Sequence, residues 1–192
     1  MPVKKCDYVN LQKPFMFNNL FTGIRIQPAC DGSRVHLFFF GKKVFLSNNY
    51  PAAFNLDGIF FFSAEQALQY RKAKFFGDDD TANRIVQMQN TCFTDMSLAG
   101  LQITISNDEN FNKWEAQIKD VMTEILMAKF RDNKEMANLL KSTYPCELVE
   151  ASPFDQFWSV GLSMNNDKID CWHNWTGENM LGKILETVRS QL

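Results

Sequence analysis

A long stretch with helical spacing constrains the fold of this chain more than any other feature. Apolar side chains recur every three or four positions through residues 110–131: Phe111, Trp114, Ile118, Val121, Ile125 and Ala128. This spacing puts the six side chains on one face of a single helix of about six turns. Such a face must be covered by other parts of the chain, so we predict a packed, helix-rich domain.

Shorter signals add further elements around this helix. Ser63 with Gln66 three residues later is a capping box, which predicts a helix over 64–75 that ends at Gly77. Other helices are predicted at 81–89, 94–99, from Asn133 to Leu140, and 178–191. Strands are predicted at 35–40 and 148–151, with a hairpin at Leu56-Asp57-Gly58-Ile59. In the last helix Gly182 implies close packing or a close ligand.

These elements predict a single α+β domain, mostly α, with a small β-sheet near its N-terminal part. Residues 1–33 are interpreted as an irregular N-terminal extension packed on or flanking a domain of residues 34–192. The aromatic run Phe60-Phe61-Phe62 is expected in the core.

Composition narrows the class of function. The chain has 192 residues, 45% of them hydrophobic and 22% charged, which is typical of one soluble globular domain. A net charge of -2 argues against sequence-independent binding of nucleic acid. Five cysteines without a CxxC pair favour a reducing compartment. No apolar stretch is long enough for a signal core or a membrane span, so we expect an intracellular, cytoplasmic protein without a membrane partner.

No cofactor or metal site is predicted. The pair Cys171-x-His173 lacks metal-ligand spacing, and the chain has neither a P-loop nor a GxGxxG motif.

Short motifs in a fixed order resemble the NADAR family of YbiA-like N-glycosidases. They cover about residues 35–192 and read Leu46-Ser47-Asn48-x-Tyr50-Pro51-Ala52 with Asp57-Gly58, Ser63-x-Glu65 with Gln69 and Lys72-Ala73, Phe76-Gly77-Asp78, Val121-Met122 with Ala128-Lys129-Phe130, Leu148-Val149-Glu150-Ala151-Ser152-Pro153-x-Asp155, Trp158-x-x-Gly161, and Gly177-x-Asn179-x-Leu181-Gly182 with Arg189. The resemblance implies cleavage of a base from a phosphorylated or ADP-linked ribose.

Some positions depart from the family pattern. Gln66 replaces a histidine and Ser159 a glycine, while three positions that carry cations in the family are Leu101, Ile118 and Met180 here. The loss of these cations implies weaker phosphate recognition or a substrate of different charge.

The predicted helix 64–75 carries the candidate catalytic groups. Glu65, Gln69 and Lys72 share one helix face by their i, i+4, i+7 spacing. A carboxylate can move protons at a glycosidic bond, and a neutral lysine can trap the opened sugar as a Schiff base. The resemblance implies that Lys72 is this lysine, and Glu65 is our acid/base candidate. By spacing alone, a solvated helix face is the commoner explanation.

Further residues are predicted to bind ligand: Ser47, Asn48, Gln69, Lys129, Asp155, Trp158 and Asn179. Four of them have a structural alternative. Asn48 suits an Asx turn, Trp158 suits the core, Lys129 suits the C-terminal dipole of its helix, and Asn179 suits a helix cap. The ligand role of Asn179 rests on free N–H groups at the start of the last helix. We predict a cleft between the helix 64–75, the segment 148–161 and the loop 46–51.

The predicted function is therefore an N-glycosidase that uses a lysine Schiff base on ADP-ribosylated guanine or a riboflavin-pathway intermediate. Its partner would be a small-molecule or nucleic-acid-linked ADP-ribosyl or phosphoribosyl substrate. Two alternatives stay open: a catalytically weak module that binds ADP-ribose or an NAD derivative, and an aromatic-rich scaffold protein.

Overall fold

The computed structural model describes residues 23–88, 93–105 and 108–192. It divides into two compact units, one of residues 48–134 and one that combines residues 1–47 with 135–192. Their elements confirm the predicted α+β class with helix predominating.

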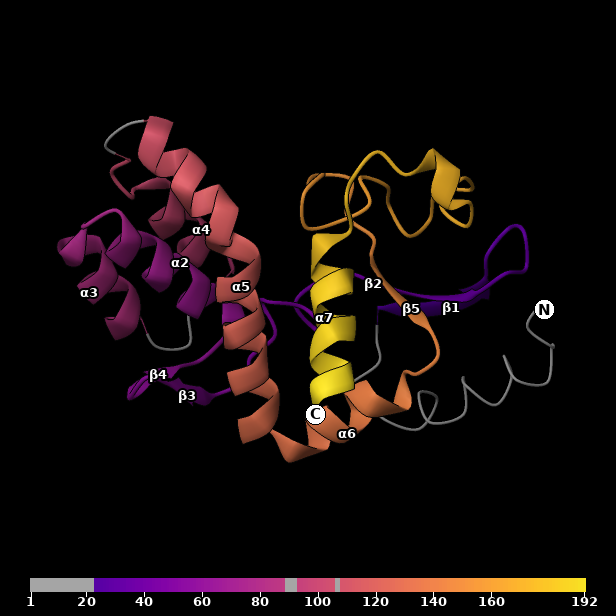
Figure 1. Cartoon of the computed structure of the whole chain (residues 1–192), viewed down its shortest axis with the longest axis horizontal. Helices are drawn as coiled ribbons and strands as arrows, with labels where there is room; N and C mark the ends of the chain where they lie inside the picture. The colour runs from indigo at the N-terminus through magenta and orange to yellow at the C-terminus, as the bar shows by residue number, and fades with distance from the viewer. Residues whose placement is uncertain (1–22, 89–92, 106–107) are drawn as a thin grey trace. The chain divides into compact units, whose positions relative to one another are not determined.

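The unit formed by the two ends of the chain contains a three-stranded sheet in the order β1-β2-β5 (Figure 1). Strand β1 (Ile24–Pro28) runs antiparallel to β2 (Val35–Phe39), and β2 runs parallel to β5 (Glu147–Glu150). Every residue of β2 is buried, as expected for a central strand. The strands predicted at 35–40 and 148–151 are thus confirmed within a residue at each end.

Strand β1 corrects the prediction that residues up to 33 are irregular. Ile24 and Ile26 alternate with Arg25 and Gln27, a period of two that the sequence analysis did not use. The strand forms because β2 offers it a hydrogen-bonding partner, with Ile26 opposite Leu37. The boundary between an extension and a domain at residue 34 stays a prediction.

Helices α6 (Lys134–Ser142) and α7 (Met180–Gln191), with the 3-10 helix η3 (Trp172–Asn174), complete this unit. Helix α7 lies against β5 (Figure 1) and buries the predicted apolar face, including Leu181, Leu185 and Val188. A Cβ added to Gly182 would lie 2.0 Å from the carbonyl oxygen of Leu148. The glycine therefore permits close contact between helix and strand, which confirms the predicted close packing.

A disulfide joins Cys30, just after β1, to Cys171, just before η3. Cys146 is a buried free thiol, and Cys6 and Cys92 lie outside the described residues. The sequence analysis did not foresee the pair, because its members are 141 residues apart and show no recognisable spacing. The compartment in which the protein works stays a prediction.

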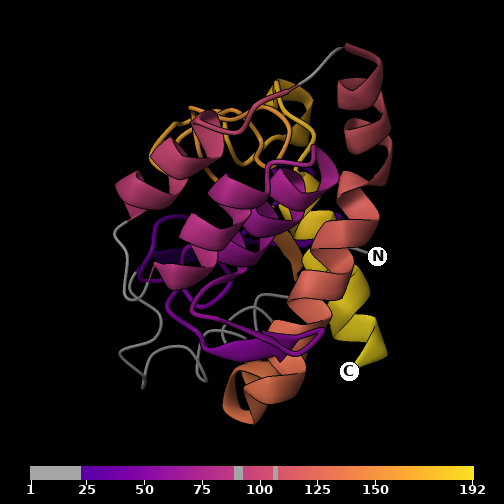
Figure 2. The ribbon, with the colours of Figure 1, turned by 90° about the vertical axis from the view of Figure 1, so that its left-hand side faces the viewer.

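The described part of the unit of residues 48–134 contains a hairpin followed by helices (Figure 2). The hairpin joins β3 (Phe54–Leu56) to β4 (Ile59–Phe61), and the helices are α2 (Ala64–Phe75), α3 (Asp79–Gln87), α4 (Phe93–Leu101) and α5 (Asp108–Asp132). Asp57 and Gly58 both have positive φ, as the predicted two-residue turn requires. All these predicted elements are confirmed, with ends that differ by at most two residues.

Helix α2 is the centre of this unit, since it packs against α3, α4 and α5. Trp114 and Ile125 of α5 are buried as predicted. The aromatic run is only partly core: Phe61 is 1% exposed, whereas Phe60 is 51% exposed because successive strand residues face opposite sides. No helix within the described ranges is both long enough and apolar enough to span a membrane.

Candidate active site on helix α2

The start of α2 is fixed by a local cap. Ser63 Oγ accepts a hydrogen bond from the Gln66 backbone N–H at 3.2 Å, as the capping box predicts. The Gln66 side chain is 1% exposed. Its amide accepts from the Phe62 N–H at 2.7 Å and donates to the carbonyls of Ile85 and Met88. At this position, where the family pattern has histidine, the glutamine therefore joins the start of α2 to the end of α3.

Glu65 and Gln69 are directly bonded on the predicted face of α2. Gln69 Nε2 donates to Glu65 Oε1 at 2.8 Å, and both side chains are partly buried. The hydrogen bond holds the Glu65 carboxylate in one orientation. The oxygen of the Gln69 amide, Oε1, takes no part in this bond. A Cβ added to Gly100 of α4 would lie 2.3 Å from this Oε1. Helix α4 therefore restricts where the amide can go.

Lys72 lies one turn further along the same face. Burial lowers the pKa of its amine, and the negative charge of Glu65 raises it, with a net lowering. The coupling shows that the two groups are near enough to influence each other's charge. A partly buried amine with a lowered pKa has a larger neutral, nucleophilic fraction than an exposed lysine.

Asn48 brings the preceding loop onto the same helix. Its backbone carbonyl accepts the N–H of Glu65 at 2.9 Å, and its side chain is 6% exposed. Within the described ranges, Asn48 Oδ1 and Gln69 Oε1 are buried acceptors with no hydrogen-bond donor. Buried acceptors without donors are costly, and they mark positions where a ligand can supply hydroxyl or amide hydrogens.

Lys129 of α5 is fully buried in the same unit. Burial lowers the pKa of its amine to about 7. Its Nζ lies 5.9 Å from the centroid of the Tyr50 ring and 5.3 Å from that of Phe130. The sequence analysis predicted a phosphate-binding cation here, a role that stays a prediction. Sequence alone gave no sign that this lysine is buried.

The other predicted site residues belong to the unit of the chain ends. Asp155 Oδ1 accepts from the backbone N–H groups of Phe157 and Trp158, at 2.8 and 2.7 Å. Ser159 Oγ donates within the same turn to the carbonyls of Ser152 and Asp155. The Trp158 ring is partly buried and packs edge-on against Phe157, with 4.8 Å between centroids. Asp155 and Ser159 thus shape the turn that carries Trp158.

Asn179 links α7 to the sheet. Its Nδ2 donates to the Leu148 carbonyl at 2.8 Å, and its Oδ1 accepts from the Glu150 N–H at 3.0 Å. It does not cap α7 with its side chain. The ligand role predicted for Asn179 assumed free N–H groups at the start of α7. This assumption is wrong for Met180 and Leu181, because their N–H groups donate to the carbonyls of Phe157 and Trp158. A ligand role for Asn179 stays a prediction without that argument.

The remaining predicted residues add less. Ser47 is 3% exposed and follows a turn in which its N–H bonds to the Val44 carbonyl. Leu101 is 82% exposed at the end of α4, and Met180 is 7% exposed. The predicted cleft also needs the segment 148–161, and it stays a prediction. Of the predicted residues, the structure brings together Asn48, Glu65, Gln69 and Lys72 around one helix face.

A helix that presents a carboxylate and a partly neutral amine, next to buried acceptors, defines a class of site suited to acid/base and covalent chemistry on a hydroxyl-rich ligand. Comparison with known proteins identifies the family. The NADAR domain matches residues 38–192, and this chain therefore belongs to the NADAR family.

Three relatives show how widely the similarity extends. Protein irg-1 of Caenorhabditis elegans is 31% identical over 176 residues, covering 84% of this chain and 82% of the relative. N-glycosidase R617 of Acanthamoeba polyphaga mimivirus is 31% identical over 131 residues, covering 67% and 73%. The NMR structure of Escherichia coli YbiA matches with a TM-score of 0.63 at 25% identity, covering 80% of this chain and 82% of that one. The predicted family and fold are confirmed, and this family includes N-glycosidases, hydrolases that act on N-glycosyl compounds.

Proposed function

We propose that this chain is an N-glycosidase that releases a base from an ADP-linked or phosphorylated ribose through a covalent adduct on Lys72. The observation that carries the proposal is the Glu65–Gln69–Lys72 face of α2, where a bonded carboxylate lies near an amine whose pKa burial lowers. The names of relatives such as N-glycosidase R617 support the reaction class.

In the proposed reaction the neutral Lys72 amine attacks the anomeric carbon of the ribose. The bond from that carbon to the base breaks, and its electron pair leaves with the base, which takes a proton from the protonated form of Glu65. The amine, now positively charged, then loses a proton to the resulting Glu65 carboxylate. The ring oxygen leaves the anomeric carbon and takes that proton from Glu65, which forms a Schiff base. Water adds to the Schiff-base carbon, the amine departs, and the sugar is released as an aldehyde that recloses.

The buried acceptors support a ribose as the group that is held. A ribose offers hydroxyl donors, and Asn48 Oδ1 and Gln69 Oε1 are acceptors with no donor among the described residues. Gln69 has a second effect, since its bond to Glu65 Oε1 positions the carboxylate. Lys129, Asp155, Trp158 and Asn179 remain our proposed ligand contacts.

The test is base release from two substrates, ADP-ribosylated guanosine and a phosphoribosyl intermediate of riboflavin synthesis, followed by chromatography. We expect Lys72→Ala to lower the rate by at least about a hundredfold. Lys74→Ala is the matched control, because Lys74 lies on the same helix but is exposed and paired with Asp79. Equal rates for the two variants would contradict the role of Lys72.

Trapping identifies the reactive amine directly. Borohydride reduction during turnover should leave a sugar adduct on the peptide that contains Lys72, and none on Lys72→Ala. An adduct on Lys129 instead would keep the Schiff-base mechanism and move it to the fully buried amine. Binding of ADP-ribose without any base release would favour the alternative of a binding module, in line with the exposed Leu101 at a family cation position.

A further inference from the structure

A second pocket lies in the unit of the chain ends, beside the start of α7. Its volume is about 410 Å³, and its lining includes Trp172, Trp175, Glu147, Glu178 and Lys183. The lining thus includes two indoles, two carboxylates and one amine, and the Glu147 carboxylate is already paired with Arg34, which lies outside the lining.

Both indoles are held in place. Trp175 Nε1 donates to the Ile169 carbonyl at 2.7 Å, which fixes the edge of the ring. The buried ring of His36 packs beside it, 5.2 Å between centroids. Trp172 stacks on His173 at 3.6 Å and stays 42% exposed. Part of the Trp172 ring is therefore accessible to a ligand.

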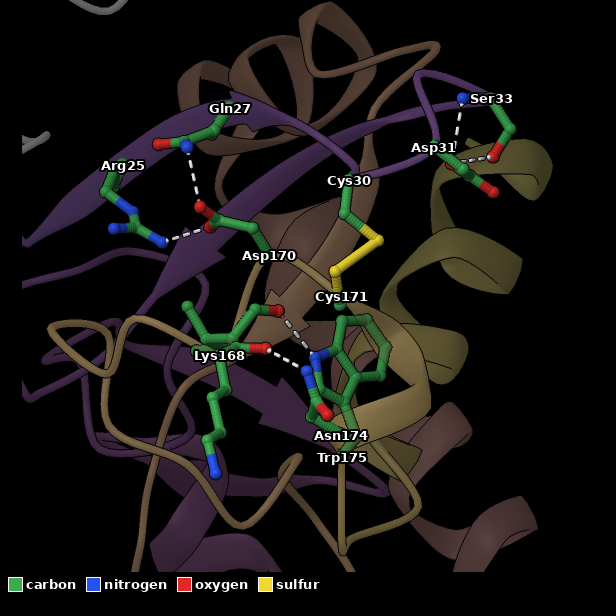
Figure 3. Close-up of a disulfide and its surroundings, with 11 residues drawn as sticks. Arg25, Gln27, Cys30, Asp31, Ser33, Lys168, Asp170, Cys171, Asn174 and Trp175 are labelled. Atoms are coloured by element: carbon green, nitrogen blue, oxygen red, sulfur yellow. Dashed lines mark hydrogen bonds and ion pairs between the residues drawn. A yellow bond between two sulfur atoms is a disulfide. The ribbon is translucent and has the colours of Figure 1, made fainter.

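The segment that carries the indoles is anchored to β1 (Figure 3). The Cys30–Cys171 disulfide brings the two Cα atoms to 5.1 Å. Next to it, Asp170 accepts hydrogen bonds from Arg25 at 2.5 Å and from Gln27 at 2.6 Å. Asn174 donates to the Lys168 carbonyl within the same segment. The aromatic wall is therefore ordered in advance, and a ligand need not spend its binding energy on ordering it.

The acidic residues differ in how they are held. Glu147 Oε2 lies 3.1 Å from His36 Nε2 and 3.2 Å from Arg34 Nη1. Burial raises the pKa of Glu147, but these two partners outweigh burial and leave its pKa lowered, so the carboxylate stays charged. Glu178 is exposed, and its backbone N–H is bonded to the Gln156 carbonyl. One carboxylate is therefore fixed at the wall, and the other is available to a ligand at the rim.

We infer that this pocket binds a guanidinium group. A guanidinium is a flat cation that stacks on indole faces and donates paired hydrogen bonds to a carboxylate. The pocket supplies both partners in the exposed indole of Trp172 and the exposed carboxylate of Glu178. The inference does not rest on the proposed glycosidase, since it uses none of the residues of α2. The group can belong to a free guanidino compound or to an arginine side chain of another protein.

The test uses the full-length protein and the indole N–H signals of Trp172 and Trp175 in two-dimensional NMR. The probe is N-acetyl-arginine amide, and the control is N-acetyl-citrulline amide, which has nearly the same shape without the charge. We expect the arginine probe to shift both signals, with the citrulline probe at least about tenfold weaker. Equal binding of the two, or binding of neither, would overturn the inference.

Substitutions at two exposed residues test whether the pocket prefers a cation or an anion, and they should leave the fold unchanged. Glu178→Gln should weaken binding of the arginine probe about five- to tenfold, and Lys183→Met should strengthen it a few-fold. The reverse order would show that the pocket prefers an anion and would overturn the inference. Agmatine and the peptide acetyl-Gly-Arg-Gly-amide separate the two sources, and whichever binds more tightly identifies the source while supporting the guanidinium site.

Discussion

The predicted site residues of the two units use their polar side chains differently. In the unit of residues 48–134, Asn48 Oδ1 and Gln69 Oε1 are buried acceptors that no described residue satisfies, next to Glu65. In the other unit, the side chains of Asp155 and Asn179 bond to backbone groups. The difference separates residues that hold the fold from residues that have capacity left for a ligand, although the same family pattern contains both.

The largest expected effect concerns the carboxylate of α2. Glu65→Gln should lower the rate of base release by about 100- to 1,000-fold, because it removes proton transfer but keeps the Oε1 that accepts from Gln69. The free energy of unfolding should change by less than about 1 kcal/mol. Glu124→Gln, which alters an exposed carboxylate of α5 paired with Arg71, is the matched control and should keep full activity.

For Asp155→Ala we expect the change in the free energy of unfolding to be the larger effect, whereas for Glu65→Gln the change in rate is the larger. The Asp155 substitution removes the acceptor of two backbone N–H groups and should lower the free energy of unfolding by about 1–3 kcal/mol in urea denaturation. If Glu65→Gln proves the more destabilising of the two, the contrast between ligand-binding residues in one unit and structural residues in the other is wrong.

The disulfide gives the largest expected effect of a substitution on stability. Cys30→Ser should lower the free energy of unfolding by about 2–4 kcal/mol, because the bond closes a long loop in the unfolded chain. Cys30 is exposed, so serine leaves no buried polar group behind. Adding dithiothreitol should destabilise the wild type to the same extent and leave the variant unaffected. A wild type that dithiothreitol does not affect would contradict a stabilising disulfide.

Asn179→Ala should destabilise by about 2–3 kcal/mol. The change removes both hydrogen bonds between the start of α7 and β5, and leaves the buried Leu148 carbonyl and Glu150 N–H without that partner. Asn174→Ala is the control, since Asn174 is exposed and makes a single side-chain bond to the Lys168 carbonyl. Similar melting temperatures for the two variants would show that Asn179 is not a structural link.

The smallest expected effect is the change of stability over a single pH unit, which comes from Lys129. Its pKa is about 7 in the folded protein against 10.5 ordinarily, so above pH 7 the unfolded chain binds more protons. The free energy of unfolding should therefore rise with pH across this window, by at most about 1.4 kcal/mol per pH unit. Urea titrations should show that Lys129→Met removes this rise, while the exposed control Lys113→Met retains it. Equal slopes in both variants would place the Lys129 pKa near its ordinary value.

The sequence by itself determined the elements whose signals are local. Ser63 and Gln66 fixed the start of α2, and Asp57-Gly58 fixed the hairpin, because a cap and a tight turn depend on a few neighbouring residues. The same helical spacing put Glu65, Gln69 and Lys72 on one face. Only the family resemblance, and no pattern of spacing, indicated that this face is a functional site and not an ordinary solvated helix face.

Tertiary structure decided what depends on distant parts of the chain. It paired Cys30 with Cys171, gave β1 its partner, turned Asn179 toward β5 and enclosed Lys129. Burial and its effect on pKa come from side chains that pack from several elements at once, and no short stretch of sequence records them. Sequence therefore named the candidate reactive groups of this protein, whereas packing determined which of them are buried, bonded or left with hydrogen-bonding capacity.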